Sequence, residues 1–316
     1  MMEGHKRIDS EIKTSDRKHA GNAAAIVSVS IASLFWGTTF STVRYGFSEM
    51  DLSPFSFLFL RFLIALLSLF PLMFIKQIRA EVFRTLRMPV ILLLGVLNGL
   101  SYGFQYAGQV STTAGIATIM MNTYVLFTPV FQRLLLKKTI NRKEIAAISA
   151  GFTGVIIITL GDLLAIRAGS ISIYGALLVL AGGLFAGLYV AFSENVMNIK
   201  MNGKLLNPVS VYFSSTVYSV VVVFFIGLFF QDLPRFTNIS YQTFALISYL
   251  GIVCTSGAFI LYLIAVRKLG AVDSAVFTLL QIIISIVIAL MLLKEIPDVF
   301  MMIGAPIVLF AVFLVR

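Results

Sequence analysis

Polar side chains recur at helical spacing in four otherwise apolar stretches of the sequence. Asn98, Tyr102, Gln105 and Gln109 follow the spacing i, i+4, i+7 and i+11, and Ser274, Thr278, Gln281 and Ser285 repeat it. Ser111, Thr118, Asn122 and Pro129 share one side of a third stretch, and Ser248, Thr255 and Tyr262 share one side of a fourth. Each set lies on one helix face. Because an unpaired amide or hydroxyl in lipid costs several kcal/mol, the four faces should meet each other or water, and together they could wall a cavity.

Asn98, Asn122, Thr255 and Gln281 lie near the middle of these stretches. Amides and hydroxyls at such positions could simply join helix to helix, at roughly 1 kcal/mol each or less. Matching faces on four helices favour a cavity, because polar joining alone does not require them. Together with Gln105, these residues form the predicted hydrogen-bonding site for a small solute.

Trp36 is the only tryptophan and lies near the middle of its apolar stretch. A tryptophan there is interpreted equally well as a residue that stacks on a solute and as ordinary core. Tyr102 would also stack on the apolar part of a solute, and Tyr189 could add an aromatic wall.

Arg61 is the one cation well inside an apolar stretch, about 10 Å from the end of its predicted helix. The favoured interpretation is structural: the side chain extends outward, caps carbonyl groups or pairs with Glu49 or Asp51. The alternative is contact with a charged substrate, because a cation inside a membrane is a candidate functional group.

Acidic residues and histidines are confined to the N-terminal segment, the connections and the ends of the stretches. We therefore expect no proton relay at mid-membrane; transport would follow a gradient or be coupled through Glu194 and Asp273 near the cytosolic mouth. The sequence contains neither a phosphate-binding G-x-x-x-x-G-K-[ST] loop nor a HExxH motif, and Cys254 is its single cysteine. It predicts no enzyme activity, no cofactor, no disulfide and no metal site.

The composition is that of an integral membrane protein: 59% of the 316 residues are apolar and 12% are charged. Ten stretches approach or exceed the roughly 20 residues that a spanning helix needs. They cover residues 23–46, 54–75, 89–109, 112–136, 144–161, 171–192, 208–230, 241–265, 272–293 and 298–315. Backbone groups in lipid must pair internally, and these stretches are too long for barrel strands. We predict an all-α membrane protein with ten transmembrane helices.

The net charge of +10 could suggest nucleic-acid binding, but the positions of the charges exclude it. Eighteen of the 24 Lys and Arg residues fall on one predicted side and four on the other. This asymmetry predicts a multi-pass protein of the plasma (inner) membrane with both termini in the cytoplasm. Residues 1–22 are predicted to be a disordered cytosolic tail.

The second half of the sequence repeats the first at an offset of 150 to 157 residues. Leu34-Phe35-x-Gly37 recurs as Leu184-Phe185-x-Gly187, Pro54 matches Pro208, Gly95 matches Gly251, Ala114 matches Ala271, and Val130-x4-Leu135-Leu136-Lys137 matches Val287-x4-Leu292-Leu293-Lys294. Five predicted helices in each half make the second copy inverted, a plan typical of transporters. Gly37, Gly187, Pro54 and Pro208 are the predicted hinges. Residues 145–160 and 299–315, in the fifth and tenth stretches, have almost no polar side chains and should be peripheral, in a monomer or at a homodimer contact.

Several of these segments resemble the EamA repeat of the drug/metabolite transporter superfamily. In the first half they are Leu34 to Phe40, Pro54 to Leu63, and Asn122 to Pro129 followed by Leu134 to Lys138; in the second they are Leu269-Gly270-Ala271 and Leu292 to Glu295. The resemblance implies one repeat over residues 23–161 and a second over 171–316. It also implies a central cavity lined by both repeats and the export or exchange of small metabolites.

These observations predict a transporter of small neutral or zwitterionic, amino-acid-like metabolites that works by alternating access and serves export. The partners expected are a small-molecule substrate and the lipid bilayer, with no nucleic acid. One alternative is an organic-anion or sugar-phosphate exchanger using Arg61 and Arg44. Another is a non-transporting membrane protein such as a lipid scramblase, which would have polar grooves facing lipid and no enclosed cavity.

Overall fold

The computed structural model describes residues 2–50, 52–112, 114–166, 173–232, 240–288, 291 and 299–314. The first half of the chain forms α1 (Met2–Glu49), α2 (Pro54–Leu69), the 3-10 turn η1 (Phe70–Phe74), α3 (Lys76–Thr85), α4 (Pro89–Gln109), α5 (Ala114–Asn122), α6 (Tyr124–Leu136) and α7 (Arg142–Ile166). The second half forms α8 (Ile173–Met197), the hairpin β1 (Lys200–Met201) and β2 (Lys204–Leu205), α9 (Pro208–Phe229), α10 (Tyr241–Ser248), the π-helical segment η2 (Tyr249–Gly257), α11 (Ala258–Leu269), α12 (Ala271–Thr278), α13 (Leu280–Ile288) and α14 (Val299–Leu314).

Seven helical runs among the described residues are long and apolar enough to cross a membrane. They are Asn22–Glu49, Pro54–Phe74, Pro89–Gln109, Ala114–Leu136, Ile173–Met197, Pro208–Phe229 and Tyr241–Leu269, with shorter apolar helices at Ala271–Ser285 and Met302–Leu314. The predicted class of an all-α membrane protein is confirmed. The predicted ninth and tenth spans, and the motif from Leu292 to Glu295, include residues outside the described ranges.

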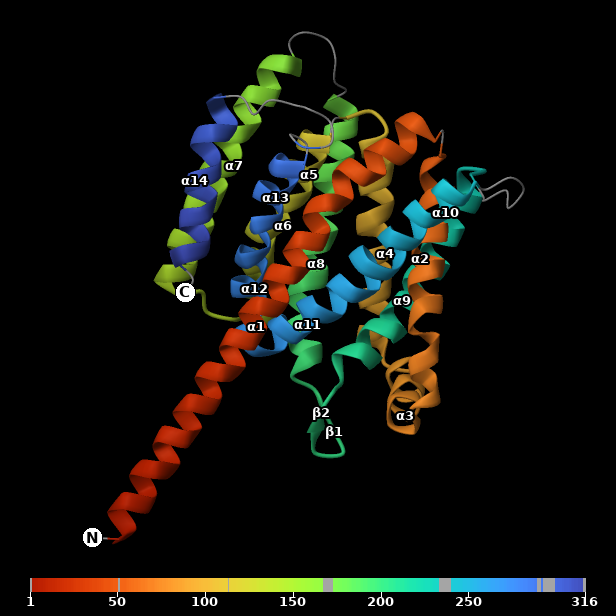
Figure 1. The fold of residues 1–316 in the computed structure, drawn as a ribbon. Coiled ribbons are helices and arrows are strands. Elements are labelled where there is room, and N and C mark those ends of the chain that lie inside the picture. Colours follow the sequence, from red (N-terminus) through yellow and green to blue (C-terminus); the bar gives the residue numbers. More distant parts are fainter. Residues whose placement is uncertain are drawn as a thin grey trace.

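Helix α1 begins at Met2, and the expectation of a disordered cytosolic tail over residues 1–22 stays a prediction. The backbone of this segment continues the first membrane helix without interruption and extends beyond the bundle (Figure 1). The sequence favours this extension, because the segment contains no proline. An apolar helix that is already formed also removes the cost of nucleation.

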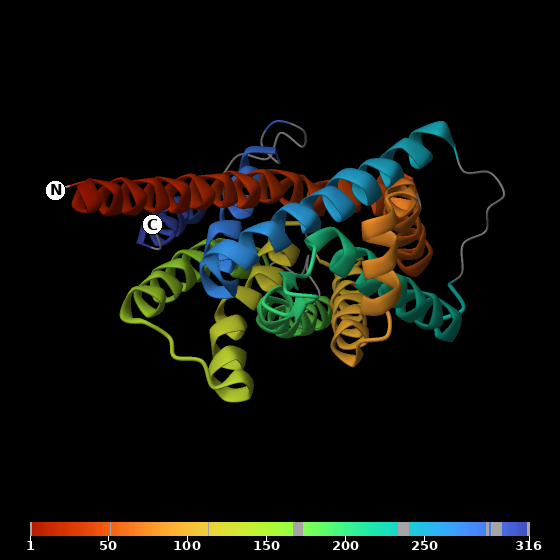
Figure 2. The same cartoon turned by 90° about the horizontal axis from the view of Figure 1, so that it is seen from below.

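Helices α7 and α14 lie side by side at one edge of the molecule (Figures 1 and 2). Their backbones approach closely: a Cβ atom on Gly154 would lie 2.8 Å from the carbonyl oxygen of Gly304. This is the packing by small residues that is typical of membrane helices. Ile156 and Phe310 on these helices are exposed and provide apolar surface for lipid.

The helices of the two halves pack in reciprocal pairs. Helix α1 packs against α11, α12 and α13, while α8 packs against α4, α5 and α6. A Cβ atom on Gly37 of α1 would lie 2.6 Å from Ile284, and one on Gly187 of α8 would lie 2.8 Å from Phe127. Gly37 and Gly187 are equivalent in the sequence repeat, and Phe127 and Ile284 stand at the repeat offset of 157. The two close contacts are therefore counterparts.

A second pair of glycines shows the same reciprocity. A Cβ atom on Gly95 of α4 would lie 2.6 Å from the carbonyl oxygen of Ser215 in α9, and one on Gly251 of η2 would lie 2.8 Å from that of Arg61 in α2. Gly95 and Gly251 are also matched in the sequence repeat. The tight crossings of α4 with α9 and of η2 with α2 thus occupy corresponding places in the two halves.

Helices α2 and α9 are joined at both ends by carboxylates. Asp232, just after α9, accepts hydrogen bonds from the Ser53 hydroxyl at 2.5 Å and from the Phe55 amide at 2.8 Å, both at the start of α2. Glu81, in α3 after α2, accepts from the Asn207 amide at 2.5 Å, just before α9. An acidic group at a helix N-terminus satisfies free N–H groups and complements the helix dipole. Each helix start is therefore held by the segment that follows the other helix.

Candidate functional site

A cavity lies among helices contributed by both halves of the chain. Its walls come from α1 (Trp36, Thr39, Phe40), α4 (Asn98, Ser101, Tyr102, Gln105), α5 and α6 (Met121, Tyr124), α8 (Ala186, Tyr189, Val190), α11 (Phe259, Tyr262) and α13 (Gln281). About 60 Å³ is open to the centres of water-sized spheres. This is room for about four to six waters, and the walls are mainly aromatic with a few amides and hydroxyls.

Five of the predicted binding residues line this cavity: Trp36, Asn98, Tyr102, Gln105 and Gln281. Asn122 and Thr255 are not among its lining residues, although both are buried. No Asp, Glu, Lys or Arg lines the cavity in the part of the chain that the structure describes. The described wall of the site is neutral, and its polar groups come from helices of both halves of the chain.

Two broken helices meet beside the cavity. The predicted span over residues 112–136 is divided at Thr123 into α5 and α6, and the span over 272–293 is divided at Leu279 into α12 and α13. Polar side chains bond to backbone carbonyls just before each break: Asn122 Nδ2 donates to Thr118 O, and Thr278 Oγ1 donates to Ala275 O. Such bonds compete with regular helix hydrogen bonding and bend helices.

Hydrogen bonds connect the two breaks to each other. Gln281 Nε2 donates to Asn122 Oδ1 at 2.6 Å, and the hydroxyl groups of Tyr124 and Thr278 are also bonded. Asn122 therefore acts behind Gln281 and not on the cavity wall. Tyr124, which the sequence analysis missed, lines the cavity. Spacing in the sequence carried no signal for Tyr124, because residues two apart do not share a helix face.

The polar face of α4 has both of the roles that the sequence left open: it joins helices, and it lines the cavity. Gln109 Nε2 donates to Phe40 O at 2.8 Å and Asn98 Nδ2 donates to Ser219 Oγ at 3.3 Å, so these amides join helices. Asn98 also lines the cavity, as does Gln105, whose amide lies 3.4 Å from Gln109 Oε1. One face therefore joins helices at Gln109 and Asn98, and it faces the cavity at Asn98 and Gln105.

The aromatic wall is built around Trp36. Its indole N–H donates to Cys254 O at 2.9 Å, and its ring lies 5.0 Å from Phe259 and 5.2 Å from Tyr262 between centroids. Tyr189 packs edge-on against Phe259 at 5.8 Å. Trp36 thus both fills the core and lines the cavity. Phe259 carried no signal in the sequence, where phenylalanine is abundant.

Arg61 is fully buried, and the expected outward extension is wrong. Its Nε donates to Thr255 Oγ1 at 2.7 Å and its Nη1 donates to the Tyr106 hydroxyl at 3.0 Å. Among the described residues it forms no ion pair, with Glu49 or any other carboxylate, and Asp51 lies outside the described residues. The close crossing of α2 with η2 places the side chain inside the bundle.

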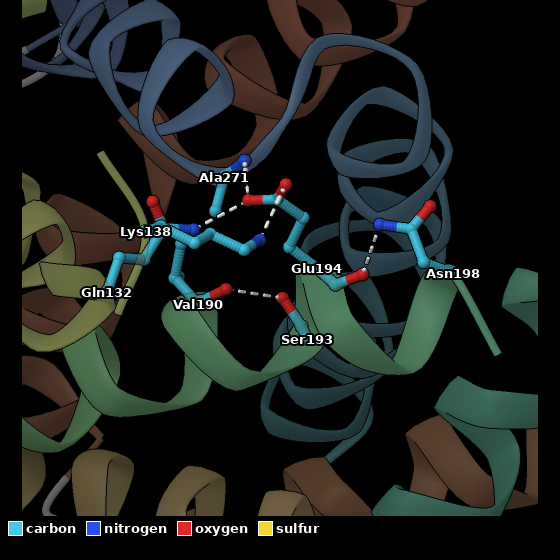
Figure 3. A network of polar contacts seen from close by, with 7 residues as sticks. All are labelled: Gln132, Lys138, Val190, Ser193, Glu194, Asn198 and Ala271. Atoms are coloured by element: carbon cyan, nitrogen blue, oxygen red, sulfur yellow. Dashed lines mark hydrogen bonds and ion pairs between the residues drawn. The ribbon is translucent and has the colours of Figure 1, made fainter. Parts of the chain in front are cut away.

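A carboxylate clasp lies at the C-terminal end of α8 (Figure 3). Glu194 accepts hydrogen bonds from Gln132 Nε2 at 2.5 Å and from the Ala271 amide at 3.0 Å, and it forms an ion pair with Lys138 at 2.8 Å. The clasp joins α8 to the end of α6 and to the first residue of α12. An anion is favoured at that helix start.

The predicted hinges fall at two kinds of position. Pro54 and Pro208 stand at the first residues of α2 and α9, where proline fits without bending the helix. Gly37 and Gly187 lie at the tight crossings with Ile284 and Phe127. The structure shows one arrangement of these helices, so the hinge function of all four residues stays a prediction.

A comparison with protein families matches the two halves of the chain separately. The model of the EamA-like transporter family matches residues 23–160 and 173–316. An uncharacterized transporter of Archaeoglobus fulgidus is 26% identical, with 93% of this chain and 97% of that protein covered. The uncharacterized transporter YyaM of Bacillus subtilis is 25% identical, with 89% of each chain covered.

One solved crystal structure of a protein has the same fold. It superposes with a TM-score of 0.68 at 15% sequence identity, covering 92% of this chain and 96% of its own. Because the family model matches nearly the whole length in two stretches, the chain belongs to the EamA-like transporter family of membrane transporters.

Proposed function

We propose that this transporter carries a small neutral or zwitterionic, amino-acid-like metabolite across the membrane by alternating access, in the direction of export. The observation that carries the proposal is a neutral cavity beside two broken helices, walled by Gln105, Gln281 and aromatic rings. Amides and hydroxyls bind uncharged polar groups, and rings cover an apolar side chain. A phosphate would require several cations, and the described cavity wall carries none.

Burial of the polar groups supports a carrier over a lipid scramblase. Asn98, Gln105 and Gln281 are at most 5% exposed and face the interior of the bundle. A scramblase would instead require polar side chains in a groove open to lipid. The outer surface of the described helices is rich in large apolar side chains such as Phe225 and Phe313.

We further propose ten helices in two inverted repeats that move relative to each other. The reciprocal contacts of Gly37 with Ile284 and of Gly187 with Phe127 support this plan, as do the carboxylates that hold the starts of α2 and α9. The broken spans also occupy corresponding places, with Ala114 and Ala271 each beginning the first fragment. Discontinuous helices near the centre of the membrane are typical of substrate sites in carriers of this plan.

The orientation proposed is the one predicted from the positive charges, in a plasma membrane with both termini in the cytoplasm. The N-terminal end of α1, helix α3 and the β1–β2 hairpin lie at the same end of the molecule (Figure 1), which supports a common cytosolic face. Exposed Arg79 and Lys204 lie at that end, on α3 and β2.

Replacing Gln281 with leucine is expected to lower transport about tenfold, because it removes a cavity amide and leaves Asn122 without its partner. The measurement is efflux of a mixture of amino acids from proteoliposomes, read by mass spectrometry against protein-free liposomes. Gln242→Leu, at an exposed position, is the matched control. Equal efflux by the two variants and the unaltered chain would remove Gln281 from the site.

Transport is expected to continue when a proton uncoupler is added and the substrate gradient is kept unchanged. The physical reason is that the described cavity wall carries no carboxylate or imidazole able to exchange a proton. Efflux from loaded proteoliposomes with and without the uncoupler checks this expectation. Loss of efflux on adding the uncoupler would show that protons drive the carrier.

A further inference from the structure

Arg61 is a buried cation that lacks an anionic partner among the described residues. Its side chain is 0% exposed, and its Nη2 has no hydrogen-bond partner. Its contacts are the neutral hydroxyl groups of Thr255 and Tyr106. A buried charge without a counter-charge is costly in a membrane protein. Arg61 therefore occupies a place where an incoming anion would be stabilised strongly.

The aromatic ring of Tyr102 contacts this cation and also lines the cavity. The guanidinium carbon of Arg61 lies 5.0 Å from the centroid of the Tyr102 ring, and Tyr102 lines the cavity. Tyr106, one helical turn along α4, lies on the side of Arg61 and accepts its Nη1 bond. Besides its contact with Arg61, the ring of Tyr102 packs with Phe62 and Phe259, at 5.2 and 6.1 Å between centroids.

We propose that the transported solute carries a carboxylate, and that Arg61 and Tyr106 bind this group when the ring of Tyr102 turns aside. The inference rests on the proposed transport function and specifies its substrate. A planar guanidinium presents two parallel N–H groups to a carboxylate, and the bonds are strengthened by charge. Nη2 supplies a donor that no protein group uses, and the Tyr106 hydroxyl can donate its own hydrogen.

The rest of the solute would stay in the neutral cavity. Gln105 and Gln281 offer oxygens to an ammonium or hydroxyl group, and Trp36 covers an apolar side chain. One cation matches one carboxylate, so the preferred solute is a zwitterion or a monocarboxylic acid and not a sugar phosphate. Thr255 keeps Arg61 in place, since its hydroxyl accepts from Nε and donates to Leu250 O.

The first test uses the unaltered protein. Proteoliposomes are loaded with equal amounts of the amino acids and the corresponding amino-acid amides, and efflux of each is measured by mass spectrometry. The acid is expected to leave at least about tenfold faster than its amide, because the amide cannot form the charged bond. Equal efflux of acids and amides would overturn the carboxylate site and leave the transport function intact. No efflux of any solute would overturn the transport function itself.

Variants of Arg61 then distinguish a role in binding the solute carboxylate from a purely structural role. Arg61→Gln is expected to lower efflux of the acid about tenfold and leave that of the amide unchanged, so that selectivity is lost. Arg61→Lys should be intermediate, because it keeps the charge without the planar fork. Arg79→Gln, at an exposed position of α3, is the control. If Arg61→Gln lowered acid and amide efflux equally, Arg61 would have a structural role only.

A third measurement does not require an Arg61 variant to fold. Phenylglyoxal modifies accessible arginines, and peptide mass spectrometry locates the modified residue. Tyr102→Ala is expected to increase modification of Arg61, and the amino acid that is transported fastest should protect it. Modification of Arg61 that is unaffected by Tyr102→Ala and by the amino acid would show that the ring does not cover a binding site.

Discussion

Replacing Gly108 with leucine is expected to remove most of the folded protein from the membrane. Gly108 lies where α4 crosses α8, and a Cβ atom there would be 2.3 Å from the carbonyl oxygen of Gly175 and 2.7 Å from Val179 Cγ2. A backbone oxygen cannot move without displacing its helix. Extra atoms in a packed interior cost about 1–3 kcal/mol, and more where the backbone must shift. Close approach through small residues is also what holds membrane helices together.

The measurement for Gly108 is the amount of monodisperse protein after extraction in detergent, followed by its thermal unfolding midpoint. Val110→Leu is the matched control, because Val110 lies at the same end of α4 as Gly108 and its side chain is exposed. We expect a normal yield for the control and a strongly reduced yield for Gly108→Leu. A Gly108→Leu protein with an unchanged yield and midpoint would show that the two helices can separate without loss of the fold.

Glu194→Gln is expected to open the end of the cavity that we propose to be cytosolic and to slow net transport about tenfold, because a carrier must spend time in both states. The carboxylate contacts three donors outside α8: Gln132, Lys138 and the Ala271 amide. A glutamine has one acceptor oxygen, and its NH₂ group would face donors. The contacts that join α8 to α6, Lys138 and α12 are thereby weakened, while the packing of α8 is kept.

Access to the cavity checks the expectation for Glu194. A cysteine at the cavity-lining position Ala186, in a Cys254→Ala background, is treated with a membrane-impermeant maleimide in inside-out vesicles. Glu194→Gln should speed labelling, and Glu49→Gln, an exposed carboxylate, should not. Labelling at the same rate in both variants would mean that the Glu194 clasp does not control access from the cytosolic side.

Several residues of the site could be predicted from the amino-acid sequence, because their common face depends only on spacing within one helix. Asn98, Tyr102 and Gln105 share a face of α4 at any packing of the bundle, and the structure places all three on the cavity wall. Gln281 was found in the same way. The correspondence of Gly37 and Gly187 could also be predicted, because each glycine lies in a copy of the same short sequence motif.

Other parts could not be predicted from spacing. The breaks at Thr123 and Leu279 arise when side chains bond to the backbone, a competition that an apolar stretch with a few hydroxyls does not decide. Asn122 was predicted on the cavity wall, and the structure places it behind Gln281. Which of the two amides reaches the cavity depends on how α5 and α13 approach each other.

The amino-acid sequence by itself determined the all-helical membrane class, the family and the polar faces. These follow from the cost of burying polar groups in lipid and from the fixed helix repeat, both of which act within a single segment. The tertiary structure alone decided the direction of Arg61. Its long side chain could reach outward past its own helix or inward to Thr255 and Tyr106. Those two hydroxyl groups come from other helices, and only the packed bundle brings them within hydrogen-bond distance.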